Sequence, residues 1–311
     1  MSKKVLIAAP VHSILTRWLE ANRYECIVRE QITQQEAMGL VQDCTGIITS
    51  TRLYVNKELM DAAPLLQWVG RMGSGMEVID LPYAAQKGVA CYSSPEGNSN
   101  AVAEHALGML LNLNKKIIKS NVEVKNGIWL RDENRGVELE GKTVGIIGFG
   151  HTGSSFARKL YGFDVQVLAY DKYVQGAVPK YWEECKHLDR IFEEADIVSF
   201  HVPLQHDTRH YLNDDFVQKM QKPFVLVNTS RGGVVDTKAL YDGLLSGKIS
   251  GACIDVWEEE PMFAMSPEMR NYLDKTAAMD NVIITPHIAG YSVEALYKMS
   301  KVLLNKIVTK R

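Results

Sequence analysis

Residues 142–160 read KTVGIIGFGHTGSSFARKL, and this stretch decides the fold. It predicts a buried strand, a glycine-rich turn and the first turns of a helix. Gly148, Gly150 and Gly153 have the spacing of a dinucleotide-binding turn. The first glycine permits a tight turn, the second lets backbone amides approach a pyrophosphate, and the third lets helix and strand pack closely. Glycine-rich turns are also common without a ligand, so this spacing alone leaves a purely structural turn open.

A second apolar strand supports the dinucleotide site. Residues 165–170 read VQVLAY and lead into Asp171, about 20 residues beyond the glycines. A carboxylate at this place can accept hydrogen bonds from an adenosine ribose, and it repels a 2′-phosphate by charge and by crowding. The sequence therefore predicts NAD as the cofactor in preference to NADP.

The composition narrows the class of protein. A chain of 311 residues is long enough for two domains with separate cores. The net charge of -2 gives no basic surface for nucleic acid. Five cysteines are scattered without a CxxC pair, which indicates reduced thiols and no metal site, and so favours the cytoplasm. The apolar run at residues 5–9 is too short for a signal peptide, and no run is long enough to cross a membrane.

The first ninety-odd residues alternate between strands and helices, which predicts a parallel sheet covered by helices. The expected strands are residues 5–9, 24–28, 46–49, 66–70 and 89–91. Thr33 and Glu36 fit a capping box at one helix start, and Asn56 is a suitable N-cap for another.

The middle of the chain is predicted to connect two domains. Residues 93–100 are rich in turn formers and are expected to form a linker. Residues 101–116 follow as a long apolar helix, and residues 121–138 are interpreted as an extended arm. We expect a homodimer, with this arm as its interface.

The alternation of strands and helices resumes after the glycine-rich turn. Strands are expected at residues 197–200, 224–228, 250–255 and 282–285, and helices at 237–246 and 292–308. Asp236 is a suitable N-cap for the first helix. The last helix needs a surface to bury against, and the first domain would supply one.

Three polar segments follow predicted strands. They are residues 229–236 (TSRGGVVD), 255–261 (DVWEEEP) and 285–290 (TPHIAG). The carboxyl ends of parallel strands meet at one edge of a sheet, so the segments should bring a guanidinium, carboxylates and an imidazole together. Hydride transfer between a nicotinamide and a 2-oxo acid needs a fork-shaped cation for the carboxylate and a proton donor for the developing alkoxide.

The sequence resembles the D-isomer-specific 2-hydroxyacid dehydrogenases over nearly its whole length. The shared segments occur in the family's order at residues 148–153, 201–203, 228–232, 255–261 and 286–287. The resemblance implies an α/β fold with two Rossmann-like or flavodoxin-like parallel-sheet domains and an active site in the cleft between them. It implies a discontinuous substrate-binding domain of residues 1–97 and 288–311, and an NAD-binding Rossmann domain of residues 98–287.

The resemblance also implies a catalytic set of Arg231, Glu260 and His287. Arg231 would hold the substrate carboxylate and ketone oxygen. His287 would be the general acid in reduction and the base in oxidation, and Glu260 would bond its other ring nitrogen and fix the tautomer. The implied cofactor-binding residues are Gly148, Phe149, Gly150, His151, Thr152, Gly153, Asp171, His201, Val202, Pro203, Thr208, Thr229 and Asp255.

Within that set, Asp255 would face the nicotinamide carboxamide, whereas Glu258 and Glu259 are interpreted as solvated surface carboxylates. His105 and His210 are among the histidines for which the sequence shows no paired context.

The substrate-binding residues implied by the resemblance are Arg52, Ser74, Gly75 and Arg231. Arg52 falls where family members that act on phosphorylated acids place a cation, although it could equally be solvated. The chain continues only a short way past Gly290, so we expect neither a regulatory domain nor an extra dimerisation domain.

The function expected is that of a D-3-phosphoglycerate dehydrogenase. A hydroxypyruvate or glyoxylate reductase, or an enzyme acting on erythronate 4-phosphate, is the alternative. A rival from another class is an NAD-sensing corepressor, against which the set of Arg231, Glu260 and His287 argues, because binding alone needs no proton donor.

Overall fold

The computed structural model describes residues 3–174, 176, 179 and 182–309. The chain divides into two compact units, each with its own parallel sheet. The smaller unit comprises the residues up to Ala101 together with those from Gly290 onward, and the larger unit is Val102–Ala289. The divisions expected from the sequence, after residues 97 and 287, lie close to these positions.

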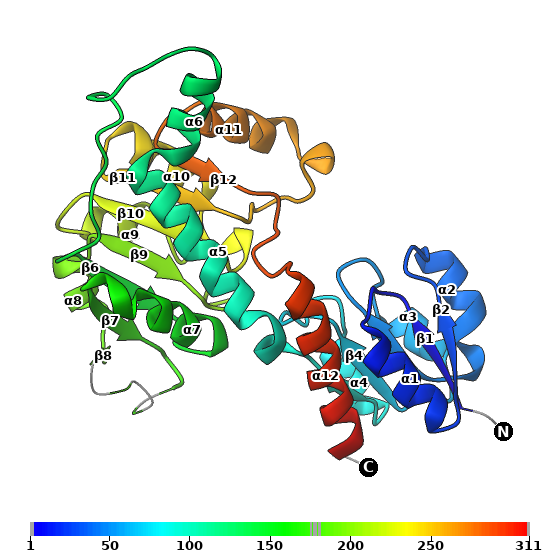
Figure 1. The fold of residues 1–311 in the computed structure, drawn as a ribbon. Helices are drawn as coiled ribbons and strands as arrows, with labels where there is room; N and C mark the ends of the chain where they lie inside the picture. Colours follow the sequence, from blue (N-terminus) through cyan, green and yellow to red (C-terminus); the bar gives the residue numbers. More distant parts are fainter. Residues whose placement is uncertain (1–2, 175, 177–178, 180–181, 310–311) are drawn as a thin grey trace. The chain divides into compact units, whose positions relative to one another are not determined.

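The smaller unit is built on five strands whose neighbours all run parallel (Figure 1). The strands are β1 (Lys3–Ile7), β2 (Tyr24–Val28), β3 (Cys44–Thr49), β4 (Trp68–Arg71) and β5 (Ala90–Tyr92). Their order is β2-β1-β3-β4-β5, so the strand order reverses between β1 and β3, as in flavodoxin-like folds. The helices between them are α1 (Ser13–Ala21), α2 (Gln34–Leu40), α3 (Lys57–Asp61) and α4 (Leu81–Gln86).

Two helix starts in this unit follow the sequence closely. Thr33 accepts a hydrogen bond from the backbone of Glu36, and the Glu36 carboxylate accepts one from the backbone of Thr33, so the predicted capping box is confirmed. Asn56 caps α3 by accepting from the backbone of Leu59 at 3.1 Å, as predicted. Each cap satisfies a backbone donor that the helix itself cannot pair.

The C-terminal helix α12 (Val293–Thr309) belongs to the smaller unit and lies beside α1 (Figure 1). Leu303 and Ile307 are buried with Val5, Ile7 and Leu15 in one apolar core. The helix therefore buries the apolar face that its sequence spacing predicts.

The larger unit is a seven-stranded sheet, also parallel throughout (Figure 1). Its strands are β6 (Thr143–Ile147), β7 (Gln166–Tyr170), β8 (Glu183–Cys185), β9 (Ile197–Phe200), β10 (Phe224–Asn228), β11 (Ile249–Ile254) and β12 (Val282–Ile284), in the order β12-β11-β10-β9-β6-β7-β8. The connecting helices are α7 (His151–Leu160), α8 (Asp189–Glu194), α9 (Asp214–Lys219), α10 (Thr237–Leu245) and α11 (Pro267–Ala277). The predicted α/β fold with two parallel sheets is confirmed.

The predicted linker at residues 93–100 is largely wrong, because α5 (Pro95–Lys115) begins inside it. Proline suits the first turn of a helix, where its missing N–H is not needed, and Glu96 favours the positive end of the helix dipole. A Cβ on Gly97 would lie 2.5 Å from the backbone nitrogen of Met299 in α12. The small residues of this segment therefore serve close helix packing.

The predicted extended arm is partly wrong, because α6 (Ile117–Lys125) takes in its first residues. None of the residues of α6 is buried, so its sequence lacks the contrast between an apolar and a polar face that reveals a helix. Residues 126–142 that follow contain no helix or strand. We call residues 117–138 the arm, and its exposed apolar side chains are Ile117, Ile118, Val122, Val124, Ile128, Trp129, Leu130 and Val137.

Among the helices of the described residues, none has both the length and the apolar character that crossing a membrane requires.

Candidate active site

The glycine-rich turn joins β6 to α7 in the larger unit. Gly148 has φ +93°, and a Cβ there would lie 2.7 Å from the carbonyl group of His201, so only glycine fits. A Cβ on Gly153 would overlap the carbonyl oxygen of Gly148. Gly150 is the N-cap of α7, and no side chain caps this helix start. A Cβ on Gly150 would meet nothing within 4 Å. The first backbone amides of α7 are thus suited to an anion.

Asp171 fastens this turn from the end of β7. One of its carboxylate oxygens accepts from the backbone of Phe149 at 2.7 Å. The other accepts from the backbones of Tyr173 and Val174 at 2.8 and 2.9 Å. A carboxylate offers about four acceptor sites, so the ribose contact expected of Asp171 remains available beside these bonds.

Two further predicted cofactor residues are buried at strand ends. His201 follows β9, and its Nε2 lies 2.9 Å from Ser199 Oγ while its buried Nδ1 has no hydrogen-bond partner. Burial lowers the pKa of the imidazole to about 3, so the ring is neutral. Its ring centroid lies 5.4 Å from that of Phe156 in α7. Thr229 follows β10, and its buried hydroxyl is likewise without a partner.

These features fit a dinucleotide. The uncapped start of α7 suits a pyrophosphate, and the partnerless hydroxyl of Thr229 can bond a polar group of a ligand at the sheet edge. Thr208 shapes the loop after β9 by donating to the carbonyl oxygen of Pro203 at 2.6 Å and accepting from the backbone of Gln205 at 2.7 Å.

Arg231 stands in a tight turn after β10. The side chain of Asn228 closes this turn, because its Oδ1 accepts from the backbone and hydroxyl of Ser230 and its Nδ2 donates to the carbonyl oxygen of Arg231. The Arg231 guanidinium donates to the carbonyl oxygen of Ser230 at 2.7 Å. The glycines that follow form a short 3-10 turn, Gly232–Val234.

Asp255, at the end of β11, is 1% exposed and holds the loop after β12. Its carboxylate accepts from the Thr285 hydroxyl at 2.5 Å and from the backbones of Ile288 and Ala289, each at 2.9 Å. His105 of α5 joins them, with its Nε2 3.0 Å from Thr285 Oγ1 and 3.6 Å from the Asp255 carboxylate. The Asp255 carboxylate therefore has a structural role that the sequence did not reveal. A nicotinamide contact would have to use the same two oxygens that accept these bonds.

His287 lies in the loop that Asp255 holds, between Thr285 and Ile288. Its φ is +55°, a left-handed conformation that is uncommon outside glycine, and its backbone N–H donates to the carbonyl oxygen of Asp255 at 2.8 Å. Its Nδ1 lies 2.6 Å from Glu260 Oε2, and the other oxygen of Glu260 accepts from the backbone of Trp257 at 2.8 Å. The carboxylate can only accept, so Nδ1 carries a proton and Nε2 is the nitrogen left for exchange.

The interpretation of Glu258 as a solvated surface carboxylate is wrong. Glu258 is not solvated, since its side chain is 13% exposed and one of its oxygens lies 2.6 Å from His210 Nε2. Glu259 accepts from the backbone and hydroxyl of Ser266 at the start of α11. His210 and His105 therefore do have paired contexts. His210, in the loop after β9, meets the segment after β11, and His105, in α5, meets the ends of β11 and β12, contacts that sequence spacing cannot reveal.

The substrate residues predicted from the resemblance lie in the smaller unit. Arg52 follows β3, and its exposed guanidinium donates to the neutral side-chain oxygen of Gln31. Ser74 and Gly75 follow β4 and are partly exposed. These residues thus come from the carboxyl ends of two neighbouring strands.

The larger unit matches a known family. Residues 107–289, more than half of the chain, match the sequence model for the NAD binding domain of D-isomer specific 2-hydroxyacid dehydrogenases. The chain belongs to this family. The family expected from the motifs is thereby confirmed, and so, at the level of the family, is NAD as the cofactor.

Relatives of this chain carry names that refer to different substrates. It is 34% identical over 283 residues to the hydroxypyruvate reductase of Thermotoga maritima, covering 90% of this chain and 89% of that protein. It is 32% identical over 306 residues to the D-3-phosphoglycerate dehydrogenase of Archaeoglobus fulgidus, covering 98% of this chain but only 56% of that protein. A solved structure, the D-lactate dehydrogenase of Aquifex aeolicus complexed with NAD and lactic acid, matches with a TM-score of 0.84 at 28% identity, covering 99% of this chain and 95% of that one.

Proposed function

We propose that this dehydrogenase interconverts a D-2-hydroxy acid and its 2-oxo acid with NAD. The observation that carries the proposal is the bond between His287 Nδ1 and Glu260 at 2.6 Å, in a loop that follows β12, two strands from the Arg231 turn after β10. NAD, when bound, supplies or accepts the hydride at the substrate carbon. The chain's own residues hold the acid and move the proton.

Each residue has a separate task in this proposal. The Arg231 guanidinium binds the substrate carboxylate through charge-assisted hydrogen bonds. In reduction, His287 gives the proton on Nε2 to the carbonyl oxygen as the hydride reaches the carbon, and in oxidation Nε2 takes it back. Glu260 stabilises the imidazolium and fixes which nitrogen faces the substrate.

His287→Ala tests the assignment of the acid and base. We expect kcat to fall by about 10²–10⁴-fold, the usual contribution of such a group, with the Kd for NADH unchanged. His187→Ala, an exposed histidine of the same unit, is the matched control. Turnover of His287→Ala within a factor of two of the wild type would contradict the assignment.

The substrate proposed first is 3-phosphohydroxypyruvate, the oxo acid of D-3-phosphoglycerate, and hydroxypyruvate or glyoxylate is the alternative. Arg52 supports an anionic substrate, because its exposed guanidinium is bonded to the neutral Gln31 side chain. Oxidation of NADH with 3-phosphohydroxypyruvate and with hydroxypyruvate, each with wild type and Arg52→Ala, separates the two. Loss of a preference for the phosphorylated acid in Arg52→Ala supports the first substrate, and equal use of hydroxypyruvate by both supports the second. Selective turnover of 4-phosphoerythronate would instead assign the erythronate branch.

We also propose a cytoplasmic homodimer that joins through the arm. The support is the group of exposed apolar side chains on residues 117–138, including Trp129, whose exposed fraction is 75%. Sedimentation should show a dimer for the wild type and a monomer for Ile118→Asp/Trp129→Asp. A monomeric wild type would overturn this part. An NADH-dependent protein partner with no turnover of any 2-oxo acid would favour the corepressor-like rival.

A further inference from the structure

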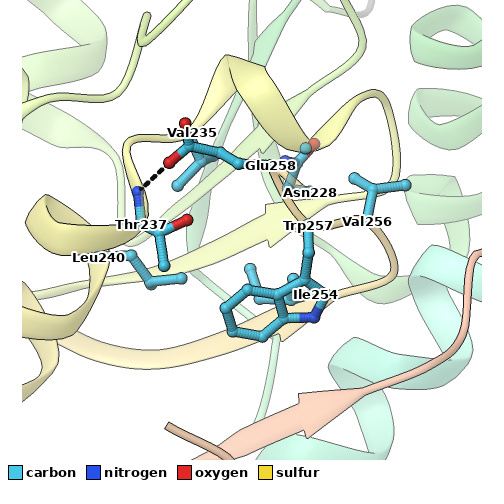
Figure 2. A pocket seen from close by; sticks show the side chains of 9 residues that line it. Asn228, Val235, Thr237, Leu240, Ile254, Val256, Trp257 and Glu258 are labelled. Atoms are coloured by element: carbon cyan, nitrogen blue, oxygen red, sulfur yellow. Dashed lines mark hydrogen bonds between the residues drawn. The ribbon is translucent and has the colours of Figure 1, made fainter. Parts of the chain in front are cut away.

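A second histidine–glutamate pair lies beside the proposed catalytic one. His210 and Glu258 approach to 2.6 Å, the same distance as His287 and Glu260. His210 also has a left-handed backbone, with φ +50°. The other oxygen of Glu258 accepts from the backbone N–H of Thr237 at 2.8 Å, where α10 begins (Figure 2).

The chain segments that carry His210 and Glu258 both contact the turn that carries Arg231. On one side, the backbone N–H of His210 donates to the carbonyl oxygen of Gly233 at 2.8 Å. On the other side, Gly232 packs so closely on the carbonyl group of Trp257 that a Cβ on Gly232 would overlap it. The turn therefore packs between the loop of His210 and the segment of Glu258. The hydrogen bond between these two side chains links the loop to the segment.

The carboxylate of this pair is largely buried, since the Glu258 side chain is 13% exposed, whereas the His210 ring is partly exposed. Figure 2 shows Glu258 next to Val235, Thr237 and Trp257 around a small cavity, which Gly232 of the turn also lines. The second ring nitrogen of His210, Nδ1, lies 3.5 Å from the Asp236 carboxylate. The imidazole is therefore bonded at Nε2 and faces a second carboxylate at Nδ1. A hydrogen bond to a largely buried carboxylate is stronger than one in water.

We propose that His210 and Glu258 are positioning residues for Arg231. The inference rests on the proposed role of Arg231 in binding the substrate carboxylate. The pair touches neither substrate nor cofactor in this proposal. It fixes the 231–235 turn so that the guanidinium is aimed before the acid arrives, and a misplacement of about 1 Å can cost as much as 100-fold in turnover efficiency.

The test compares five variants of the full chain: Glu258→Ala, Glu258→Gln, His210→Ala, the double variant Glu258→Ala/His210→Ala, and Glu259→Ala. Glu258→Gln keeps an oxygen that can accept from Thr237, so it should rescue part of the loss. Glu259→Ala removes the neighbouring carboxylate, which serves Ser266 and not the Arg231 turn, and is the matched control. For each variant we would measure KM and kcat for hydroxypyruvate, the Kd for NADH, the melting temperature and hydrogen exchange of the peptide containing residues 231–235.

We expect Glu258→Ala and His210→Ala to raise KM at least tenfold, with kcat falling less and the Kd for NADH unchanged. Hydrogen exchange should become faster in residues 231–235, and Glu258→Gln should lie between Glu258→Ala and the wild type. The double variant Glu258→Ala/His210→Ala should be no worse than either single one, because both remove the same link.

Different failures have different meanings. Unchanged KM in an active enzyme, or unchanged exchange at residues 231–235, overturns the positioning role and leaves the proposed function standing. Equal effects of Glu259→Ala also overturn it, because they would show a general loss of structure. A wild type that turns over no 2-oxo acid overturns the proposed function itself, and the role in substrate binding with it.

Discussion

Adding one methyl group at two glycines of the nucleotide turn should separate cofactor binding from folding. A Cβ on Gly150 meets nothing within 4 Å, so Gly150→Ala should alter the free energy of unfolding by no more than about 0.5 kcal/mol. The same methyl group lies at the uncapped start of α7, where a phosphate must approach the backbone amides. We expect the Kd for NADH to rise at least tenfold, a loss of about 1.4 kcal/mol.

Gly153→Ala is the contrasting variant. Its Cβ would overlap the carbonyl oxygen of Gly148 and lie 3.1 Å from the carbonyl carbon and 3.3 Å from Ile146 Cγ2. Because these partners are backbone and a fully buried side chain, α7 must shift, which should destabilise the protein by about 1–3 kcal/mol.

Thermal unfolding by circular dichroism and titration of NADH by fluorescence measure the two effects separately. Gly150→Ala should unfold like the wild type and bind NADH weakly, whereas Gly153→Ala should lose both stability and binding. Wild-type affinity in Gly150→Ala would refute the placement of the pyrophosphate at α7. Wild-type stability in Gly153→Ala would refute the close packing of helix and strand.

Two further predictions concern His201 and Asp171. The pKa of His201 is about 3 in the folded protein and about 6.5 in an unfolded chain. The unfolded state therefore binds more protons between these values, and the free energy of unfolding decreases as the pH is lowered through this range. From pH 7.5 to pH 5 this histidine should account for about 2 kcal/mol, and His201→Gln should show a shallower decline of melting temperature; an identical pH slope would contradict the neutral buried ring. Asp171→Ser should lower the ratio of kcat/KM for NADH over NADPH by at least tenfold, about 1.4 kcal/mol, and an unchanged ratio in steady-state assays would count against a carboxylate that excludes the 2′-phosphate.

Sequence reasoning reached most strands because they are largely apolar runs, and it reached Arg231 and His287 because both lie just after such runs. It missed β8, whose sequence begins with two exposed glutamates. It failed where the same residue types serve two purposes. Pro95 and Gly97 signal a turn in isolation, yet here they begin a helix and admit another helix close to it. Packing partners about two hundred residues away decide between these outcomes, as Met299 does for Gly97.

The segment after β11 shows the same limit for the site. Residues 255–260 carry four carboxylates, and their spacing does not reveal which are buried. In the fold, Asp255 accepts from the backbone of the His287 loop, Glu258 bonds the His210 ring, and Glu260 bonds the His287 ring. These partners come from loops after β12 and β9, so the strand order β12-β11-β10-β9 is needed to assign them.

With this strand order, Glu258 and Glu260 of one segment each bond a histidine of a different loop. His287 and His210 both occupy left-handed backbone conformations, which cost on the order of 1–3 kcal/mol and persist only where surrounding bonds determine them. Each of these histidines is bonded by a different glutamate of one short segment, and β11 lies between the two strands whose loops must be aimed. The segment after β11 can therefore fix both the position of His287, the proposed proton donor, and the position of the Arg231 turn. A change in its length should disturb both together, whereas a change in either histidine should disturb only one.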